Sequence, residues 1–169
     1  MPEAAYGIFC SGGPGINGVL QDSETMNFVM SRRNDQYITS VCTRSLVLGA
    51  AVLVSGYKAT THWMSMDLLG SMGVHAISER VVADGNRITG AGVTSGIDFA
   101  LQLASVLFGT NCSIEIQLQI EYNNPHAPFN AGHPNIADPE MVGRIRALNF
   151  QQQEQRRMMI RNLIGKRPF

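Results

Sequence analysis

Cysteine is scarce in this chain, and both long apolar runs and an export signal are missing from it. The 169 residues include three cysteines, Cys10, Cys42 and Cys112, whose number and spacing exclude a disulfide framework and a zinc motif. No apolar stretch reaches about 18 residues, the length that a membrane-spanning helix needs. The N-terminus has neither the positive start nor the apolar run of a signal peptide. We therefore expect a cytoplasmic protein with reduced thiols and no membrane partner.

An excess of charge of one sign is also missing. Thirteen Lys and Arg balance thirteen Asp and Glu, which argues against nucleic acid as a partner. The balance is uneven, because residues 144–169 carry seven basic side chains and one acidic, whereas residues 1–143 carry six and twelve. The C-terminal basic residues could bind an anionic partner, but a solvated helix face is the simpler interpretation. This group comprises Arg156, Arg157, Arg161, Lys166 and Arg167.

Hydrophobic sequence is abundant and runs through the chain without internal division. Hydrophobic residues make up 44% of the chain and charged residues 15%, a composition that supports a packed core. No repeat, low-complexity tract or linker divides the sequence, and its length suits one domain. We expect a single domain over residues 1–169.

Short β-rich segments alternate with helical ones. The expected elements are strands at 6–10, 37–41 and 87–89, and helices at 46–53, from 94 or 95 onward, and at about 139–164. The last helix has a clear start, because Asp138-Pro139 combines an N-cap with proline at the first helical position. This alternation is typical of the α/β class, with a mostly parallel sheet and helices on both faces. Ligands of such sheets bind at the carboxyl ends of the strands.

Cys42 lies where the strand 37–41 meets the following helix. Unpaired backbone amides at a helix N-terminus stabilise a thiolate, and a sharp strand-to-helix turn is the geometry of the nucleophile elbow. The position therefore predicts a reactive cysteine. The alternative is a small buried side chain without chemistry, which is the usual role of a free cysteine.

A glycine-rich turn follows the first expected strand. Residues 13–18, Gly-Pro-Gly-Ile-Asn-Gly, match the dinucleotide fingerprint G-x-G-x-x-G in form, but Pro14 removes an amide donor that a phosphate would use. Because this turn and Cys42 both follow strands, the glycine amides could instead form an oxyanion hole opposite Cys42. A tight turn without a ligand is the third interpretation.

His62 follows Cys42 by 20 residues, in Ala-Thr-Thr-His-Trp at 59–63. A Cys/His pair supports nucleophilic catalysis where the two side chains meet in space. A structural, hydrogen-bonded histidine is an equal alternative. The histidines and cysteines show no metal-ligand spacing, so we expect no metal site.

Several motifs occur together in a fixed order. They are Cys-Ser-Gly-Gly-Pro-Gly-Ile-Asn at 10–17, Ser-Val-Cys-Thr-Arg-Ser-Leu-Val-Leu-Gly-Ala-Ala at 40–51, Ala-Thr-Thr-His-Trp at 59–63 and Ala-Gly-Val-Thr-Ser-Gly-Ile-Asp-Phe-Ala-Leu at 91–101. In these motifs the chain resembles the ThiJ/PfpI superfamily, whose members have a flavodoxin-like three-layer sandwich related to class I glutamine amidotransferase domains. Gln-Leu-Gln-Ile-Glu-Tyr at 117–122, followed by Pro-Phe-Asn-Ala-Gly at 128–132, is most similar to the isonitrile hydratases.

The resemblance implies an activity and a site. Isonitrile hydratases are lyases that add water to an isonitrile to give an N-substituted formamide, without metal or organic cofactor, and are typically homodimers. Carried over to this chain, the resemblance makes Cys42 the nucleophile, turns the amide and hydroxyl of Thr43 toward the substrate, and places Gly13 in the loop opposite. Gly12 and His62 are further candidates for the site. The implied partners are a small-molecule substrate and a second copy of the chain.

Two departures from the family pattern bear on activity. The family domain begins with a strand, a helix and a strand ahead of the glycine turn, and this sequence lacks them, so we expect an N-terminally truncated fold with an exposed sheet edge. That segment carries the acid that assists proton transfer, so its loss predicts impaired activity. Arg44 replaces a glycine two residues after the nucleophile, and we expect it either to point outward or to shift the elbow. Its charge would favour a thiolate if it lay near Cys42.

Two other functions compete with the hydratase. Related domains serve as small-molecule sensors in transcription regulators, where the ligand binds without turnover. A glyoxalase-like or deglycase-like protective protein would use the same thiol on carbonyl adducts. Formamide formation would indicate the hydratase, ligand binding without turnover would indicate the sensor, and turnover of glyoxals would indicate the protective protein.

Overall fold

The computed structural model describes residues 7–123, 129 and 131–165, in which short strands alternate with helices. The elements are β1 (Gly7–Cys10), α1 (Ile16–Gln21), α2 (Ser23–Ser31), η1 (Arg32–Asn34), β2 (Tyr37–Val41), η2 (Cys42–Arg44), α3 (Ser45–Ala50), β3 (Lys58–Ala59), η3 (Trp63–Ser65), α4 (Met66–Gly70), β4 (His75–Ala76), β5 (Val81–Asp84), β6 (Arg87–Gly90), α5 (Ser95–Phe108), α6 (Thr110–Gln119) and α7 (Pro139–Gly165). The η elements are single 3₁₀ turns. Tyr6 of the first expected strand, and residues 128 and 130 of the expected motif at 128–132, lie outside the described residues.

The central sheet has four strands in the order β1-β2-β6-β5, and β5 runs antiparallel to β6. β1, β2 and β6 are parallel, in a register that runs from Gly7 opposite Tyr37 to Val41 opposite Gly90. Their carboxyl ends therefore meet at one edge, where the glycine turn and Cys42 follow two neighbouring strands. Among the described strands, β1 pairs with β2 alone, so β1 and β5 are the two edge strands of the sheet.

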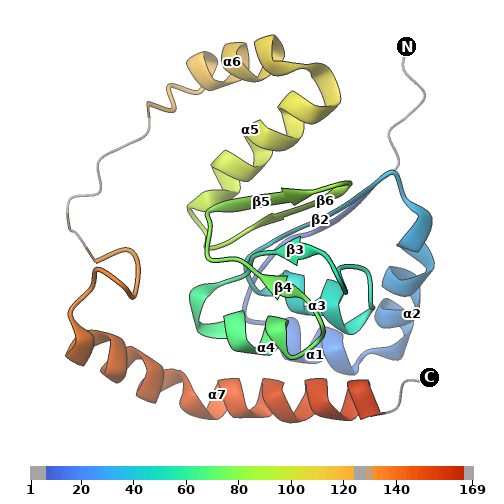
Figure 1. Cartoon of the computed structure of the whole chain (residues 1–169), viewed down its shortest axis with the longest axis vertical. Coiled ribbons are helices and arrows are strands. Elements are labelled where there is room, and N and C mark those ends of the chain that lie inside the picture. The colour runs from blue at the N-terminus through green and yellow to red at the C-terminus, as the bar shows by residue number, and fades with distance from the viewer. Residues whose placement is uncertain (1–6, 124–128, 130, 166–169) are drawn as a thin grey trace.

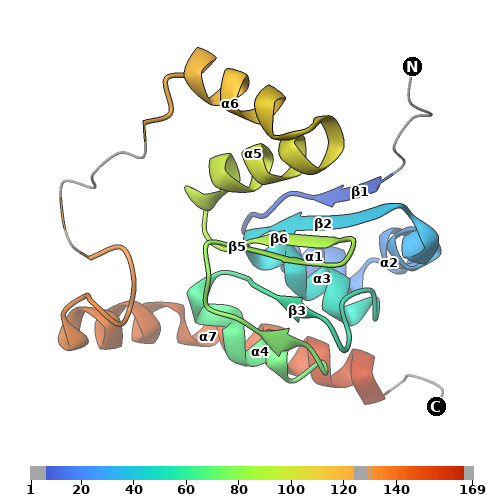
Figure 2. The ribbon, with the colours of Figure 1, turned by 45° about the horizontal axis from the view of Figure 1, so that its top comes forward.

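Helices cover both faces of this sheet (Figures 1 and 2). α5 lies on one face with α6 packed against it, and α1, α3, α4 and α7 lie on the other side. A separate parallel pair, β3 with β4, contacts β5 through β3. The three layers confirm the α/β sandwich that the alternation of strands and helices predicted.

The two faces of the sheet bury very different amounts of apolar surface. Toward α1, α3, α4 and α7, the described chain buries nineteen hydrophobic side chains in one cluster, which extends from Leu46 of α3 to Ile160 of α7. All six residues of α3 are buried. Toward α5, the second cluster contains three buried side chains, Val41, Ile88 and Phe99. The stability of the fold therefore resides mainly on the α3 side of the sheet.

α7 is a 27-residue helix that packs along α1 and α3 (Figure 1). It begins at Pro139, and the Asp138 carboxylate accepts a hydrogen bond from the Met141 backbone N–H at 3.0 Å. The N-cap expected at this position is therefore present. Ile160 is 1% exposed and joins α7 to the main core.

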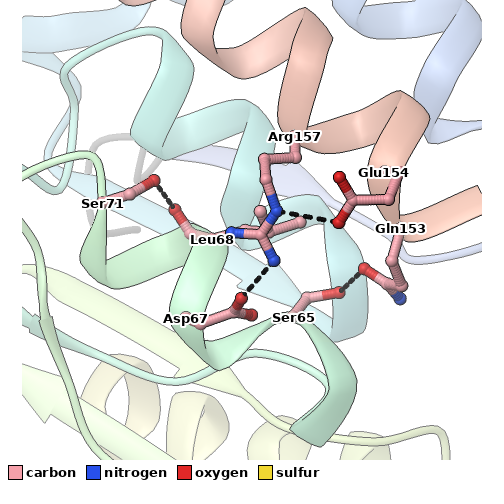
Figure 3. A network of polar contacts seen from close by, with 7 residues as sticks. All are labelled: Ser65, Asp67, Leu68, Ser71, Gln153, Glu154 and Arg157. Carbon is pink, nitrogen blue, oxygen red and sulfur yellow. Dashed lines mark hydrogen bonds and ion pairs between the residues drawn. The ribbon is translucent and has the colours of Figure 1, made fainter. Parts of the chain in front are cut away.

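A network of polar side chains sets the rotation of α7 against α4 (Figure 3). Arg157 donates hydrogen bonds to Glu154 Oε1 on its own helix, at 3.1 Å, and to Asp67 Oδ2 on α4, at 2.7 Å. One turn earlier, the Ser65 hydroxyl donates to Gln153 Oε1 at 3.4 Å. These contacts determine which side of α7 faces the interior.

The basic residues of this helix do not form one solvated face, so that prediction was wrong. Arg156 is 4% exposed and Ile160, one turn later, is 1% exposed, whereas Arg161 is exposed. Helical periodicity explains the difference, because residues four apart share a face and the next residue points elsewhere. Lys166 and Arg167 lie outside the described residues.

Candidate active site

Cys42 occupies a strained turn between β2 and the helix that follows. Its φ of 62° lies in the left-handed region, which costs a residue other than glycine about 1–2 kcal/mol. β2 ends at Val41 and η2 begins at Cys42 itself, so the residue stands at the carboxyl edge of the sheet. Strand, turn and helix follow one another as in a nucleophile elbow.

Hydrogen bonds to the Cys42 carbonyl hold this conformation. The Thr61 hydroxyl donates to the Cys42 oxygen at 2.9 Å, and the Ser45 hydroxyl donates to it at 3.4 Å. Ser45 also shares a 2.8 Å hydrogen bond with Ser40 of β2. All three hydroxyl residues are buried, and a strained backbone persists where its surroundings fix it in this way. Thr61 was not predicted as a site residue, although the motif at 59–63 contains it.

The glycine turn after β1 lies directly against Cys42. A Cβ atom at Gly12 would come within 2.5 Å of the Cys42 Cβ and within 2.8 Å of the Val41 oxygen, so only glycine permits this approach. Gly13 has a φ of 154°, a conformation that L side chains rarely adopt. The Thr43 hydroxyl donates to the Gly13 carbonyl oxygen at 3.3 Å. The structure therefore brings together four of the five residues expected at the site.

Cys42 lines a cavity of about 570 Å³ between the glycine turn and α5. The lining residues are Phe9, Ser11, Gly12, Gly13, Val41, Cys42, Val93, Gly96, Phe99, Ala100, Leu103, Ala104, Leu107 and Phe108. None of these residues is Asp, Glu, His, Lys or Arg, and Phe9 and Phe99 stack with their ring centroids 5.6 Å apart. A cavity of this composition favours a neutral, hydrophobic ligand.

His62 lies beside this cavity rather than in it. It lines a neighbouring cavity of about 470 Å³. The His62 Nδ1 accepts a hydrogen bond from the Met64 backbone N–H at 3.4 Å, so the neutral ring carries its proton on Nε2. Burial lowers the pKa of His62, and the charge of Arg156 lowers it further. The geometry favours the structural alternative for this histidine.

Arg156, which was expected in solvent, lies close to the elbow. Its Nε donates to Asn17 Oδ1 at 3.1 Å, and Asn17 is the second residue of α1, just after the glycine turn. Burial lowers the pKa of Arg156, and its electrostatic interaction with Cys42 partly offsets that change. The excess of basic residues after position 144 was the one sequence signal for this contact, and it does not indicate which arginine points inward.

Arg44 follows the elbow without displacing it. Its φ of −71° and ψ of −15° continue the helical backbone, and Gly12 still lies against Cys42. The side chain is partly buried, and its Nε is buried without a hydrogen-bond partner among the described residues. Burial raises the pKa of Cys10, and the charge of Arg44 partly offsets that rise. Arg44 was expected either to point outward or to shift the elbow. The structure shows neither, because the side chain is partly buried and the elbow is formed.

Other reactive groups are few in this part of the structure. The cavity beside Cys42 has no carboxylate among its described lining residues. Within residues 7–123, 129 and 131–165, no group of three or more His, Cys, Asp or Glu could hold a metal ion. No described helix is long and apolar enough to cross a membrane. Among the described lining residues of the cavity, the Cys42 thiol and the Ser11 hydroxyl are the side-chain groups that could act as a nucleophile.

The curated proteins similar to this chain include an enzyme and a transcription regulator. Over 140 residues the chain is 47% identical to an isonitrile hydratase of Pseudomonas putida. The aligned region covers 82% of this chain and 61% of that protein. Over 89 residues it is 33% identical to the HTH-type transcriptional regulator CdhR of Pseudomonas aeruginosa. This aligned region covers 52% of this chain and 26% of the regulator. The chain thus spans less than two thirds of the length of either relative.

Solved structures and a family profile agree with the fold. A ThiJ/PfpI family protein from Pseudomonas syringae superposes with a TM-score of 0.86 at 39% identity, over 92% of this chain and 64% of that one. The DJ-1/PfpI family profile matches residues 3–106, which contain the glycine turn, the elbow and the start of α5. The resemblance and the flavodoxin-like fold class predicted from the motifs are therefore confirmed, and the chain belongs to the DJ-1/PfpI family.

Proposed function

We propose that this protein is an isonitrile hydratase-like enzyme that adds water to a hydrophobic isonitrile through Cys42. The observation that carries the proposal is the position of Cys42, in a strained turn that opens into an uncharged, apolar cavity. The 47% identity to an isonitrile hydratase supports the substrate class. An isonitrile is neutral and exposes a reactive terminal carbon, so it suits both the cavity and the thiol.

The reaction balances with water as its second substrate. The Cys42 thiolate attacks the terminal isonitrile carbon, a C–S bond forms, and that carbon takes a proton, which gives a thioimidate. Water then adds to the same carbon and the nitrogen takes a proton. The C–S bond breaks, and its electron pair returns to sulfur. The product R–NH–CHO contains the oxygen and both hydrogens of one water molecule.

The residues around Cys42 divide the remaining tasks. The backbone of the glycine turn at Gly12 and Gly13 lies opposite the thiol, where amides can stabilise negative charge that develops on the bound substrate. Thr43 fixes this turn through its bond to the Gly13 carbonyl. The rings of Phe9 and Phe99 enclose the R group. In this proposal no metal or organic cofactor takes part, and the protons come from water.

A substrate comparison tests the proposal. Purified protein is incubated separately with cyclohexyl isonitrile and with methylglyoxal, and the products are quantified by chromatography. We expect N-cyclohexylformamide to accumulate and methylglyoxal to remain. Consumption of methylglyoxal without formamide formation would assign the thiol to carbonyl chemistry and contradict the proposal.

Ligand binding without turnover is the second candidate, because the chain is also 33% identical to a transcription regulator. The same apolar cavity would then hold a ligand that is not transformed. Titration calorimetry with cyclohexyl isonitrile separates the two functions. Saturable binding without formamide formation would favour the sensor.

We also propose that the protein acts as a homodimer, as the family resemblance implies. Among the described strands β1 is an edge strand, a surface that a second copy could cover. Light scattering during size-exclusion chromatography tests this proposal. A mass of twice 18.4 kDa is expected, and a monomeric mass would contradict it.

A further inference from the structure

Arg156 is a buried cation to which the described chain offers no anionic side chain. It is 4% exposed, and the salt bridges between described residues involve Arg32, Arg80 and Arg157 instead. Its side-chain hydrogen bond goes to a neutral acceptor, Asn17 Oδ1. A buried guanidinium without a carboxylate is costly, so another group must account for its position.

The geometry around Arg156 points to the Cys42 thiol as that group. Asn17, which binds Arg156, follows the glycine turn, and Gly12 of that turn lies against Cys42, so the guanidinium and the thiol both lie beside the segment 12–17. Arg156 interacts electrostatically with Cys42 and with His62, but a histidine is neutral or cationic and cannot serve as the anion. Arg44, a second charged residue near the elbow, interacts electrostatically with Cys10 and partly offsets the rise in its pKa. Burial raises the pKa of Cys10 and so disfavours its thiolate, which makes Cys42 the better candidate for negative charge beside Arg156.

We propose that Arg156 is a positioning residue that stabilises the thiolate of Cys42 and anchors the glycine turn through Asn17. The proposal rests on the function proposed above for Cys42 as a nucleophile. Its two effects have separate origins. The charge of the guanidinium acts on sulfur, whereas the hydrogen bond to Asn17 holds the start of α1, which directly follows the turn that faces Cys42.

The packing of α7 supports this assignment. Arg157 binds Asp67 on α4 at 2.7 Å (Figure 3), and Ile160 is buried in the main core. These contacts on both sides of Arg156 fix the rotation of the helix, so that Arg156 turns toward α1. A segment outside the matched family region 3–106 thereby completes the environment of the elbow.

The test measures alkylation of each cysteine by iodoacetamide from pH 5 to pH 10, by peptide mass spectrometry, in four variants. Arg156→Gln keeps a hydrogen-bond donor and removes the charge, and we expect the pH of half-maximal Cys42 alkylation to rise by about 0.5–1 unit. The rate at pH 7 falls about three- to tenfold accordingly. Arg156→Lys restores the charge and most of the profile. Arg161→Gln removes an exposed arginine from the same helix and leaves the profile unchanged, as a matched control.

Asn17→Ala separates the two effects. It keeps the Arg156 charge, so the alkylation profile stays within about 0.3 unit of the wild type, whereas formamide turnover falls about tenfold because the glycine turn loses its anchor. Cys10 and Cys112 serve as internal references in the same digests. Should Arg156→Gln fail to fold, as judged by urea unfolding, Arg156→Met takes its place in the test, because methionine removes the charge and keeps an apolar stem of similar length.

The outcomes distinguish this inference from the proposed function. A folded Arg156→Gln protein with an unchanged Cys42 profile overturns the inference, and so does an Arg156→Lys protein that alkylates like Arg156→Gln. If the variants shift the profile but the wild type forms no formamide, the proposed function fails and the electrostatic role of Arg156 stands.

Discussion

The two faces of the central sheet contribute to the site in different ways. On one face, α1, α3 and α7 surround a continuous core, and every residue of α3 is buried. On the other face, α5 buries Ser95 and Phe99 and α6 buries Ser113, while Phe108 and Leu118 are more than half exposed. Cys42 lies at the boundary between a densely packed region and a sparsely packed one.

This difference separates two tasks. The packed side fixes the backbone of Cys42 through buried hydroxyls and the close approach of Gly12. The α5 side supplies one wall of the cavity, from Val93 to Phe108. Substitutions on the packed side should therefore change stability and reactivity together, and substitutions of the cavity-lining residues of α5 that are not buried should change substrate choice alone.

The largest expected effect is on stability, from Leu46→Ala in α3. Leu46 is 0% exposed, and truncation of such a side chain lowers the free energy of unfolding by about 2–5 kcal/mol. Leu118→Ala in α6 removes the same atoms from a side chain that is 82% exposed, and should cost less than about 0.5 kcal/mol. Urea unfolding measures both. Equal losses would show that the two faces do not differ as described.

Gly12→Ala should have the next largest effect, on reactivity. The added methyl group would lie 2.5 Å from the Cys42 Cβ, so either the glycine turn or the elbow must move. A displacement of about 1 Å can lower a catalytic rate roughly 100-fold, and we expect such a loss in formamide formation. Gly18→Ala in α1 is the matched control, because no atom lies within 4 Å of the added group. Equal activity of the two variants would contradict the contact.

Ala104→Phe should alter substrate choice with little change in stability. Ala104 lines the cavity from α5, so a larger side chain there excludes bulky R groups. We expect the KM for cyclohexyl isonitrile to rise about tenfold, which corresponds to a loss of roughly 1.4 kcal/mol in binding free energy. The KM for methyl isonitrile should change little. Val106→Phe, on the same helix but outside the cavity lining, serves as the control. A uniform loss with both substrates would place the effect on folding instead.

The smallest effect concerns the pH dependence of stability through His62. Burial and the Arg156 charge lower the pKa of His62 in the folded protein, whereas the unfolded chain binds the proton at the ordinary pKa near 6.5. The folded state therefore binds fewer protons below that pH, and its stability declines as the pH falls from about 6.5. His62→Gln should reduce this decline in urea unfolding at pH 5.5 and 7.5. An identical decline in the variant would assign it to other groups.

Local sequence patterns predicted the elements that carry the site, because their signals lie within a few residues. The strand 37–41 and the helix that begins at Ser95 occur as expected. The helix expected at 46–53 ends at Ala50, because Val52 adopts a positive φ of 63°. Neither glycine nor proline stands at this position, so the sequence gives no signal for the end of the helix. The short strands β3, β4 and β5 depend on pairing partners that composition does not specify.

The site could be predicted where topology alone brings residues together. Gly12 and Cys42 follow adjacent parallel strands, so their proximity follows from the fold class. The position of Arg156 could not be predicted, because it depends on how α7 docks and rotates against the rest of the chain. That rotation is set by tertiary contacts such as Arg157 with Asp67.

The central claim is that the Cys42 thiol is the nucleophile of an isonitrile hydration. The most direct measurement compares formamide formation from cyclohexyl isonitrile by the wild type, Cys42→Ala and Cys10→Ala, each checked for folding by urea unfolding. We predict formation by the wild type and by Cys10→Ala, and none above the uncatalysed rate by Cys42→Ala. Formamide formation by folded Cys42→Ala at the wild-type rate would contradict the claim.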